Sequence, residues 1–544
     1  MKTLDCLIIG HYEAGTLNLY TQLEKLGKQS GSYRDFNLGF VSRGEDKMSL
    51  SQVYNYNMDL IGESGKKIRD RNTFNAAISY LGTYLHRAGL TFDYVTSVTE
   101  EYHRFEEIFR EYNVLSVAVL TTLYVTPHPI IEVVKIVKRY SSTAKIIVGG
   151  PYISTLCRTK DDDYISYVCK NLLKADYYIN SSKGEESLKN LIAAIKTDGP
   201  IEGVKNLFYL EGEHIMKNLV LSENTALNSN MVNWSLFAGD QKEFVNLRTA
   251  VSCPYACAFC GFPENAGKYQ TVEPDLVELE LNDLVKYNTK LKSIYFIDDT
   301  FNVPKARFKE MLRMIIKNKY EFKWHSYFRC QHADEEAIQL MKDSGCEGVF
   351  LGIESGSNAI LKNMTKQSTV EHYERGIAML NKAGIMTFGA FITGFPGETF
   401  KTVRETIKFI ENSGLDFFRT QMWFCEHITP IWRQREEYGI TGEGFDWTHN
   451  TMDSKTATSF VEKLFLDVKN VTWLPQHDFD YENVFRLRHS GMSLDQIKSM
   501  IHVFNDSIRH KVRNPHDTEM SDEHFDKISI ILQRAFSKEP ESIS

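Results

Sequence analysis

Three cysteines lie close together in the stretch "VSCPYACAFC" at residues 251–260. Cys253, Cys257 and Cys260 have C-x3-C-x2-C spacing, follow an apolar run and share their segment with a proline. Cysteine is often buried, but core packing explains three thiols in one such segment poorly. Thiolate sulfur is a preferred ligand of zinc and of iron–sulfur clusters. The segment therefore predicts a metal centre.

The number of thiols separates the possible centres. A structural zinc site takes four ligands, usually from two Cys pairs, and this chain has no second pair and no histidine downstream before His325. A disulfide would leave one thiol over, and nine cysteines that are otherwise scattered indicate a reducing compartment. A [4Fe–4S] cluster held by three thiolates keeps one iron open for another ligand. The sequence favours such a cluster, as a catalytic cofactor.

The elements around the cysteines predict a parallel α/β barrel of six strands. Polar residues follow these strands: the cysteines, Asp298–Asp299, Arg329, Glu354–Ser355 and "GFPGE". In α/β barrels the carboxyl ends of the strands carry the chemistry, so we expect these residues on one rim. The candidate strands are 245–251, 291–297, 323–329, 347–353, 385–393 and 415–424, with helix-like segments between them.

The first 200 or so residues also alternate apolar strand-like runs with amphipathic helices. This pattern predicts an α/β, doubly wound (flavodoxin-like) parallel sheet, which binds ligands at the carboxyl ends of its strands. Its candidate strands are 4–10, 92–98, 115–125, 144–150 and 175–181. We predict four parts: an N-terminal domain (1–205), a linker (206–240), a partial (β/α)6 barrel (241–430) and a mostly helical C-terminal cap (431–544).

The composition narrows the class of protein. The chain has 544 residues, 42% of them hydrophobic and 25% charged, as in globular proteins. Its net charge of −8 argues against nucleic-acid binding and favours a small-molecule or peptide substrate. The opening "MKTLDCLIIGHYE" does not predict a signal sequence, and no apolar run predicts a membrane span. We expect a cytoplasmic multidomain protein with no membrane partner.

The cysteine motif, with Phe259 before its last cysteine, resembles the signature of the radical S-adenosylmethionine (SAM) superfamily. In that family the open iron of a [4Fe–4S] cluster binds the amino and carboxylate groups of SAM. An electron from the cluster, supplied by an external donor such as flavodoxin or ferredoxin, then cleaves SAM to methionine and a 5′-deoxyadenosyl radical. The resemblance implies that Cys253, Cys257 and Cys260 hold the cluster.

The other strand ends resemble SAM-binding segments of the same family. Asp298 and Asp299 would contact the SAM amine or the substrate, unless they only cap a helix. Arg329 would lie near SAM, or else form a structural ion pair, and Glu398 could be no more than a carboxylate at a helix start. The resemblance implies SAM contacts for Phe259, Asp298, Asp299, Arg329, Glu354, Ser355 and Gly394.

Two stretches of the first domain, "KIIVGGPYIS" and "ADYYINSSKGEESL", resemble the cobalamin-binding branch of the superfamily. Gly149 and Gly150 would let the backbone lie close to the corrin, although a routine glycine turn would look the same. The D-x-H-x-x-G motif that supplies a histidine ligand to cobalt is absent, so we expect cobalamin without such a ligand. The implied cobalamin-binding residues are Gly10, His11, Thr121, Thr122, Gly149, Gly150, Gly184 and Glu185.

Three further stretches, "SYLGTYLHRAGLTFDYV", "ITPIWRQREEYGI" and "FDWTHNTMD", resemble the phosphinate P-methyltransferase group. They imply a methyltransferase that moves a methyl group from SAM through methylcobalamin to an unactivated carbon or a phosphinate phosphorus of a natural-product-type substrate. Rearrangement or cyclisation without methylation, and a metal- or cobalamin-binding regulator, remain as alternatives. Catalytic candidates are Cys425, His427 and Arg329, with His449 as a further one, and Arg419 and Arg433 are candidates for an anion-binding pocket.

Overall fold

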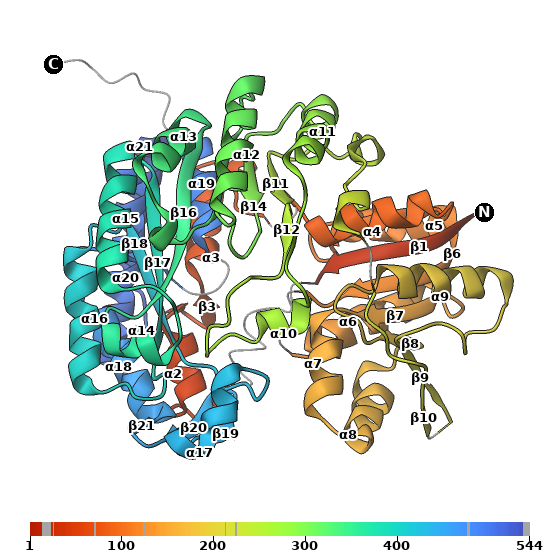
Figure 1. The fold of residues 1–544 in the computed structure, drawn as a ribbon, viewed down its shortest axis with the longest axis horizontal. Coiled ribbons are helices and arrows are strands. Elements are labelled where there is room, and N and C mark those ends of the chain that lie inside the picture. The colour runs from red at the N-terminus through yellow and green to blue at the C-terminus, as the bar shows by residue number, and fades with distance from the viewer. Residues whose placement is uncertain are drawn as a thin grey trace. The chain divides into compact units, whose positions relative to one another are not determined.

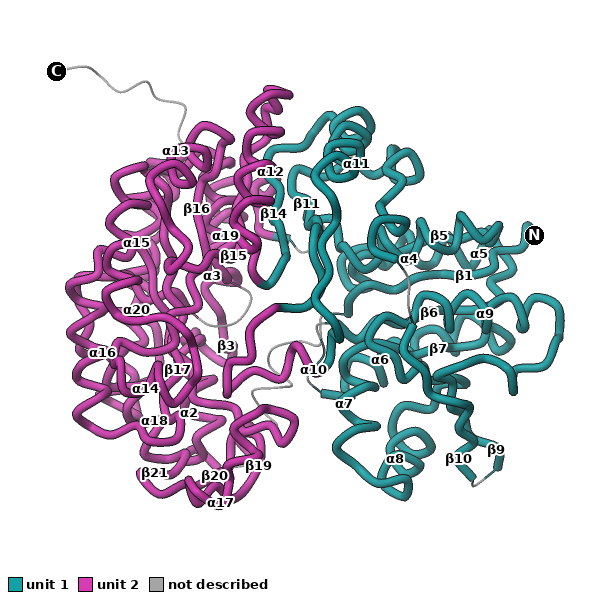
Figure 2. The backbone as a smooth tube through the Cα atoms, viewed as in Figure 1, with its two compact units in different colours: residues 1–16, 69–253, 265–299 teal, residues 17–68, 254–264, 300–544 magenta. Residues whose placement is uncertain are grey.

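The computed structural model describes residues 1–12, 23–25, 27–69, 72–122, 124, 126–212, 214–223, 226–475 and 479–536. The chain forms two compact units (Figure 2). Unit 1 comprises residues 1–16, 69–253 and 265–299, and unit 2 comprises residues 17–68, 254–264 and 300–544. These units divide the chain at other points than the predicted domain boundaries. The polar tail at 537–544 lies outside the described residues, as do parts of the loop after the strand predicted at 115–125.

Unit 1 contains a seven-stranded sheet in the order β10-β9-β8-β7-β6-β1-β5. Its five parallel strands have the order of a flavodoxin-like sheet, which confirms the predicted fold class. The predicted linker contributes β9 and β10, which pair antiparallel at one edge. The strands are β1 Lys2–His11, β5 Phe92–Ser97, β6 Tyr112–Leu120, β7 Lys145–Gly149, β8 Tyr177–Ile179, β9 Leu207–Glu211 and β10 His214–Lys217.

This sheet forms because its strands are apolar on both faces. Residues Cys6–Ile9 of β1 are fully buried, as in a parallel sheet covered by helices on both sides. The helices of this part (Figure 1) are α4 Ala76–Arg87, α5 Tyr102–Glu111, α6 His128–Tyr140, α7 Pro151–Thr159, α8 Asp162–Tyr167 and α9 Glu185–Thr197. The core between strands and helices is made largely of Ile, Val and Leu side chains.

Unit 1 also holds the first strands of the predicted barrel. β4, β11 and β14 run parallel in the order β14-β11-β4, and β12 pairs antiparallel with β13. The predicted strand at 245–251 is therefore split into β11 and β12, and the short β4 was not predicted. The bounds are β4 Thr73–Phe74, β11 Phe244–Leu247, β12 Ala250–Val251, β13 Gln270–Thr271, α11 Pro274–Tyr287 and β14 Ser293–Phe296.

Unit 2 contains the other four barrel strands in a parallel sheet, β22-β18-β17-β16-β15. The edge strand β22 comes from the region predicted as a helical cap. The strands are β15 Lys323–Tyr327, β16 Cys346–Glu354, β17 Met386–Thr393, β18 Phe417–Met422 and β22 Thr472–Trp473. The helices between them are α12 Lys305–Asn318, α13 Glu335–Asp343, α14 Asn358–Asn363, α15 Val370–Ala383 and α16 Phe400–Asn412.

The end of the chain is mostly helical, as predicted, with one small sheet. Strands β19 Thr441–Glu443, β20 Asp446–His449 and β21 Met452–Asp453 form that sheet. The helices are α18 Ser454–Asp467, α19 Tyr481–His489, α20 Leu494–Arg513 and α21 Asp522–Phe536. Within the described ranges, every helix is too short or too polar to serve as a membrane span.

A segment from early in the chain completes unit 2. It consists of α2 Gly31–Asn37, the hairpin β2 Val41–Arg43 with β3 Asp46–Met48, and α3 Leu50–Leu60. The buried ammonium of Lys511 in α20 donates to the carbonyl oxygens of Asn37 and Phe40. Helix α2 also packs against α18 and β18. The segment is thereby fixed beside the last strands of the sheet of unit 2.

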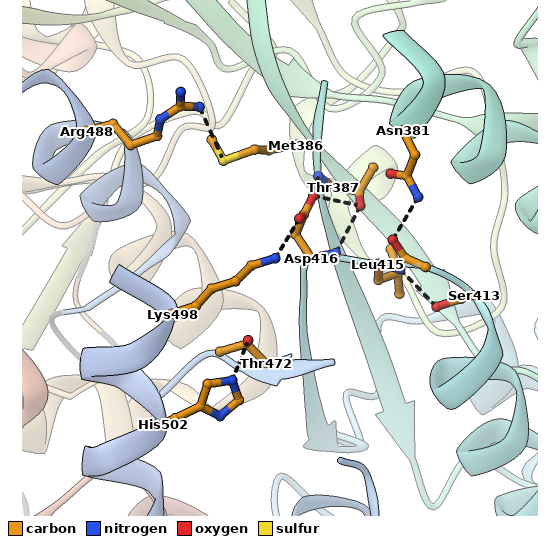
Figure 3. A network of polar contacts seen from close by, with 11 residues as sticks. Asn381, Met386, Thr387, Ser413, Leu415, Asp416, Thr472, Arg488, Lys498 and His502 are labelled. Carbon is orange, nitrogen blue, oxygen red and sulfur yellow. Dashed lines mark hydrogen bonds and ion pairs between the residues drawn. The ribbon is translucent and has the colours of Figure 1, made fainter. Parts of the chain in front are cut away.

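The amino ends of the strands in unit 2 are joined by a network of polar contacts (Figure 3). Asp416, just before β18, accepts hydrogen bonds from Lys498 Nζ (2.7 Å) and from the backbone N–H of Thr387 (3.0 Å). The hydroxyl of Thr387 accepts in turn from the backbone N–H of Asp416 (3.2 Å). Thr472 in β22 lies 3.1 Å from His502 Nε2. These contacts tie three strands and helix α20 together.

Candidate functional site

The part of the cysteine segment that lies in unit 2 is held by its backbone. The N–H of Ala258 donates to the carbonyl oxygen of Met364 (2.8 Å), and its own carbonyl oxygen accepts from the N–H of Ile431 (2.9 Å). A Cβ at Gly261 would lie 2.7 Å from Ile428 Cγ2, so only glycine fits there. Cys257 is buried and Cys260 is half-buried. These backbone contacts place the segment, and the Cys260 sulfur also accepts a hydrogen bond from the N–H of Phe262 (3.4 Å).

The donor set of this segment fits an iron–sulfur cluster by its chemistry. All nine cysteines are described, and none forms a disulfide. Among the described residues, no three His, Cys, Asp or Glu side chains are already gathered as a metal site. Cys253 belongs to unit 1, whereas Cys257 and Cys260 belong to unit 2. The ligand role of the three cysteines stays a prediction that rests on their type and spacing.

A buried ion pair lies at the carboxyl end of β16. Glu354 Oε1 accepts from Lys366 Nζ at 2.8 Å, and both side chains are almost fully buried. Burial alone would lower the pKa of Lys366, but the charges of Glu354, Tyr373 and Cys257 together outweigh it and raise that pKa. Glu354 has a φ of 71°, in the left-handed region that costs a non-glycine residue energy. A strained, buried carboxylate at a strand end is typical of a functional site.

A second cation lies beside this pair in unit 2. The guanidinium of Arg329 lies 3.6 Å from the centre of the Tyr255 ring and donates to the carbonyl oxygen of Lys366 (2.6 Å). Lys366 Nζ is 5.4 Å from the centre of the Phe259 ring. Tyr255 and Phe259 flank Cys257 in the sequence, so both cations border the cysteine segment. Cations in such a position attract anionic ligand groups.

Sequence reasoning missed Lys366. It lies in "NMTKQST", twelve positions after Glu354, and no spacing rule links a lysine in a turn to a strand-end glutamate. Thr365 and Gln367 on either side have φ values of 51° and 55°. This double left-handed turn aims the ammonium back at Glu354, and the sequence carries no recognisable signal for it.

The two aspartates after β14 differ in what they contact. Asp298 is buried and accepts from the backbone N–H groups of Thr249 (2.6 Å) and Ala250 (2.8 Å) and from the hydroxyl of Thr249. Its carboxylate therefore fixes the backbone that leads into the cysteine segment, which is a positioning role. The Asp299 side chain keeps access to solvent, although partial burial of its carboxyl group and the charge of Asp298 raise its pKa to about 7.

Ser355 and Gly394 are both tightly packed. The hydroxyl of Ser355 is buried, lies 3.3 Å from Thr406 Oγ1 and accepts from the N–H of Ser357 (3.2 Å). Gly394 has a φ of 92°, and a Cβ there would lie 2.7 Å from the Trp447 ring. Its carbonyl oxygen lies 3.0 Å from His449 Nε2. The structure thus shows protein neighbours for both residues, and their predicted SAM contacts stay predictions.

Glu398 lies in the turn after β17. It is buried and accepts from the N–H of Gly394. Burial raises the pKa of Glu398 to about 8, and the hydrogen bond from Gly394 offsets that only in part. The side chain is therefore mostly protonated at neutral pH and braces the turn, rather than acting as a charged helix-start residue.

Two weaker catalytic candidates, Cys425 and His427, and the anion-pocket candidate Arg433 are occupied by protein contacts. Cys425 is buried, its backbone pairs with Gly444 (2.8 Å), and burial raises the pKa of its thiol to about 11. His427 is exposed and stacks on Trp432, with ring centres 3.8 Å apart. Arg433 pairs at the surface with Glu264 (3.0 Å). None of these three contacts points to catalysis.

In unit 1 the sheet has one topological switch point, between β1 and β6. The chain leaves β1 toward β5 on one side and leaves β6 toward β7 on the other. Ligands of such sheets bind outside the carboxyl ends of these two strands. His11 ends β1, and Thr121 and Thr122 directly follow β6. The ring of His11 lies 5.8 Å from that of Tyr124. Three predicted cobalamin residues thus meet at the switch point.

The neighbouring strand ends hold two of the predicted glycines. Gly150 has a φ of 112°, and a Cβ there would lie 2.8 Å from Thr121 Oγ1. Thr121 is buried and donates to the carbonyl oxygen of Gly149 (2.9 Å). Thr121 therefore shapes the turn after β7, while Thr122 is exposed. Gly149 has no atom within 3.4 Å of a Cβ position, so its backbone is open to close approach.

The other predicted cobalamin residues have distinct surroundings. A Cβ at Gly10 would lie 2.7 Å from Ile78 Cδ1, so Gly10 lets α4 pack against β1. Gly184 has a φ of 67° and precedes α9. Glu185 is buried, and burial raises its pKa to about 7 although the charge of Arg248 opposes this. Its Oε2 has no hydrogen-bond partner among the described residues.

A cavity of about 630 Å³ lies elsewhere in unit 1, along the edge strand β5. Tyr94, Arg104 and Asp240 are among its lining residues. None of the predicted site residues lines it, although its lining residues between 86 and 94 belong to the stretch "SYLGTYLHRAGLTFDYV", so its size alone does not mark it as the site.

Comparison with known proteins agrees with the geometry. Residues 247–410 match the model of the radical SAM superfamily. The chain is 27% identical over 317 residues to an uncharacterized methyltransferase of Pyrococcus horikoshii, which covers 57% of this chain and 66% of that protein. It is 22% identical over 380 residues to the anaerobic magnesium-protoporphyrin IX monomethyl ester cyclase of Cereibacter sphaeroides, covering 66% of this chain and 60% of the cyclase. The chain thus spans just under two thirds of the length of these relatives.

Two solved structures share the fold. One is the radical SAM methyltransferase TsrM from Kitasatospora setae with cobalamin and a [4Fe–4S] cluster bound, with a TM-score of 0.59 and 17% identity over 81% of this chain and 96% of TsrM. The other is the cobalamin-dependent radical SAM enzyme OxsB with aqua-cobalamin bound, with a TM-score of 0.58 and 14% identity over 85% of this chain and 72% of OxsB. The matched family segment contains the three cysteines and the strand ends described above. Residues 247–410 of this chain thus match a radical SAM domain.

Proposed function

We propose that the protein is a cobalamin-dependent radical SAM methyltransferase. Its [4Fe–4S] cluster would be held by Cys253, Cys257 and Cys260, with SAM beside the Glu354–Lys366 pair and cobalamin at the switch point of unit 1. The observation that carries the proposal is the buried ion pair and the Arg329 cation bordering a C-x3-C-x2-C segment. The match to the radical SAM model and the methyltransferase among the relatives support it.

Bound together, the cluster and SAM supply a one-electron cleavage of SAM, and cobalamin supplies a carrier for a methyl group. The residues of the chain bind and orient these groups. The amino and carboxylate groups of SAM would bind the open iron, with the Glu354 carboxylate and the Lys366 ammonium as charged neighbours. The Arg329 guanidinium adds positive charge beside the cysteine segment, where it would attract an anionic group of a ligand.

Unit 1 offers cobalamin a carboxyl-end edge of a flavodoxin-like sheet. Gly149 and Gly150 allow close approach of a planar ring system, and Thr122 and His11 lie at the adjacent strand ends. The Gly184–Glu185 step lies before α9 in the same unit. Since no D-x-H-x-x-G motif is present, we propose that these residues hold cobalamin without a histidine ligand to cobalt.

The substrate class is the finer part of the proposal. The resemblance to phosphinate P-methyltransferases favours a small or peptidic substrate methylated at phosphorus or at an unactivated carbon. The acceptor atom, an external electron donor such as flavodoxin or ferredoxin, and a cytoplasmic location stay predictions.

Counting the products of SAM tests the proposal. The chain is purified without oxygen in the presence of cobalamin, reconstituted with iron and sulfide, and given SAM, a strong reductant and candidate substrates. Methylation through cobalamin yields both S-adenosylhomocysteine and 5′-deoxyadenosine, measured by mass spectrometry. A preparation that binds zinc in place of iron, or cleaves no SAM under reductant, contradicts the proposal and favours a regulator.

A second function is favoured by one relative. The magnesium-protoporphyrin IX monomethyl ester cyclase is named for ring closure, and its match extends over more of this chain than that of the uncharacterized methyltransferase. Cyclisation or rearrangement without methyl transfer yields 5′-deoxyadenosine but no S-adenosylhomocysteine. The same product count therefore separates the two functions.

A further inference from the structure

One face of the parallel sheet in unit 2 is partly open to solvent. Because side chains alternate along a strand, Gly352, Ala390 and Arg419 occupy neighbouring positions on one face of β16, β17 and β18. We call this the inner face. Its members Tyr327, Phe350, Gly352, Ala390, Ile392 and Arg419 are half-buried, and Gln421 is exposed. On the opposite face, Leu351, Ile353, Phe391 and Phe418 are fully buried. Only the inner face can therefore receive a ligand.

Helix α19 closes the inner face at the amino ends of its strands. The Tyr481 ring packs against Phe388 and Phe417, with ring centres 5.3 and 6.2 Å away. Phe485 stacks on His325 at 4.3 Å. Exposure then increases along β18, from buried Phe417 through half-buried Arg419 to exposed Gln421. A ligand would thus enter from the carboxyl ends and stop near Arg419.

Arg419 carries a charge that no acidic side chain neutralises directly. It has no ion pair within 4 Å among the described residues. Its one polar contact is with Gln421, whose amide oxygen, in the orientation that satisfies both amide atoms, accepts from Nη2 at 2.7 Å. Burial lowers the pKa of Arg419 to about 10, with Asp35 and Asp480 opposing the shift, so it remains charged at neutral pH. Several guanidinium N–H groups are left for an oxyanion.

Asp35 in α2 is the matching acidic group. It is buried, and its Oδ1 has no hydrogen-bond partner among the described residues. Burial raises the pKa of Asp35 to about 7. The charge of Arg419 lowers this pKa, and the charge of Glu462, which is paired with Arg34, raises it. A buried carboxyl oxygen without a donor costs free energy unless a ligand supplies one. Asp35 and Arg419 come from adjoining elements, since α2 packs against β18, and among the described residues no hydrogen bond or ion pair joins their side chains.

We propose that Arg419 and Asp35 bind the head group of an α-amino acid, with the substrate carboxylate on Arg419 and its ammonium group on Asp35. An amino-acid head supplies the acceptor that Arg419 lacks and the donor that Asp35 lacks, and it leaves both charges compensated. The aromatic side chains of Tyr327 and Phe350 would then face the rest of the ligand. This inference names a substrate class for the proposed methyltransferase and rests on that function only in calling the ligand a substrate.

Binding of amino acids to the purified chain tests the inference without catalysis. The twenty proteinogenic L-amino acids are screened at millimolar concentration by saturation-transfer NMR, without SAM. The strongest binder is then compared with its N-acetyl and carboxamide derivatives, which lack the ammonium and the carboxylate. We expect both derivatives to bind at least about tenfold more weakly, because each loses one charge-assisted contact. Absence of any binder, or equal affinity of either derivative, overturns the inference.

Variants assign the two contacts. Arg419→Gln should weaken binding of the free amino acid about tenfold or more and leave binding of the carboxamide unchanged. Asp35→Asn should also weaken binding of the free amino acid about tenfold or more, and should leave binding of the N-acetyl derivative unchanged. Arg404→Gln, at an exposed position of α16, is the matched control and should bind as the unchanged chain does. Unchanged affinity in Arg419→Gln contradicts the inference. If a variant does not fold, the derivative series on the unchanged chain still decides.

Failure of this inference and failure of the proposed function are distinguishable. Cobalamin and cluster content are read from the visible absorbance of the reconstituted chain. A chain that holds both cofactors but binds no amino acid loses only the substrate assignment. A chain that binds an amino acid through Arg419 but holds neither cofactor refutes the methyltransferase and keeps the binding site.

Discussion

The two ends of the parallel sheet in unit 2 differ in whether their acidic groups stabilise the fold. At the amino ends, Asp416 is paired with Lys498 and hydrogen-bonded to Thr387, so both oxygens of its carboxylate have partners (Figure 3). At the carboxyl ends, Glu354 has a strained backbone, and Glu398 in the turn after β17 is held protonated. The same strands thus begin in a stabilising network and end in groups that cost stability.

This difference locates function more sharply than any single contact. Polar groups that satisfy one another hold the fold, and strained or unsatisfied groups persist where a ligand completes them. In α/β barrels the residues at the carboxyl ends of the strands carry the chemistry, and those at the amino ends serve stability. Substitutions at the carboxyl ends should therefore change activity first, and those at the amino ends should change stability alone.

The largest effect is expected at the cysteines. Cys257→Ala and Cys260→Ala each remove a cluster ligand, so SAM cleavage should fall at least about a thousandfold and the iron–sulfur absorbance near 400 nm should disappear. Cys157→Ala, a half-buried thiol of unit 1, is the control and should keep both. Full cluster absorbance in either first variant would show that the segment is not the metal site.

Lys366→Met tests the buried pair. Removal of the ammonium leaves the Glu354 carboxylate buried and unpaired, which costs about 3 kcal/mol of the free energy of unfolding. If the pair holds SAM, affinity for SAM should also fall about a hundredfold, as measured by equilibrium dialysis. Lys362→Met, exposed in the same segment, should change neither quantity. Normal SAM affinity with lowered stability would reduce the pair to a structural one.

The pH dependence of stability tests Glu398. Its pKa is raised in the folded state from 4.5 to about 8. Between these values the folded chain keeps a proton that the unfolded chain releases, so the free energy of unfolding falls as pH rises. Glu398→Gln should remove a part of this decrease on the order of 3 kcal/mol, measured by urea unfolding at pH 5 and pH 9. Parallel curves for the variant and the unchanged chain would contradict the assignment.

The smallest effect is expected at the amino ends. Asp416→Asn weakens its bond to Lys498 and should lower the free energy of unfolding by about 1–2 kcal/mol, with SAM cleavage unchanged. Asp467→Asn, in an exposed pair with Lys463, should cost less than about 0.5 kcal/mol. A loss of activity in Asp416→Asn at constant stability would break the contrast between the two ends.

Much of the fold follows from local patterns in the sequence. The parallel strands are long apolar runs, and helices such as α15 and α20 start at capping boxes, so their positions could be predicted. The short strands β4 and β22 could not, because two-residue strands carry no periodicity and exist only by pairing with β11 and β18. The association of residues 17–68 with unit 2 is likewise set by long-range packing, such as that of Lys511 on Asn37.

The candidate site divides in the same way. Cysteines in a fixed spacing and a glutamate at a strand end are visible in the sequence. The sequence does not show that a turn brings Lys366 to Glu354, or that helix α2 brings Asp35 near Arg419, which lies far away in the chain. The aspartates show a further limit. "IDDTF" identified both, but only the structure shows that Asp298 is used to hold backbone.

That use of Asp298 bears on biosynthesis. The stretch leading to the first cysteine is secured by a carboxylate that the ribosome adds about 45 residues later. When all three cysteines of a nascent chain have been synthesised, Asp298, which holds the backbone before them, has not yet been added. We therefore expect iron to bind only after β14 and Asp298 have been synthesised and folded against the segment.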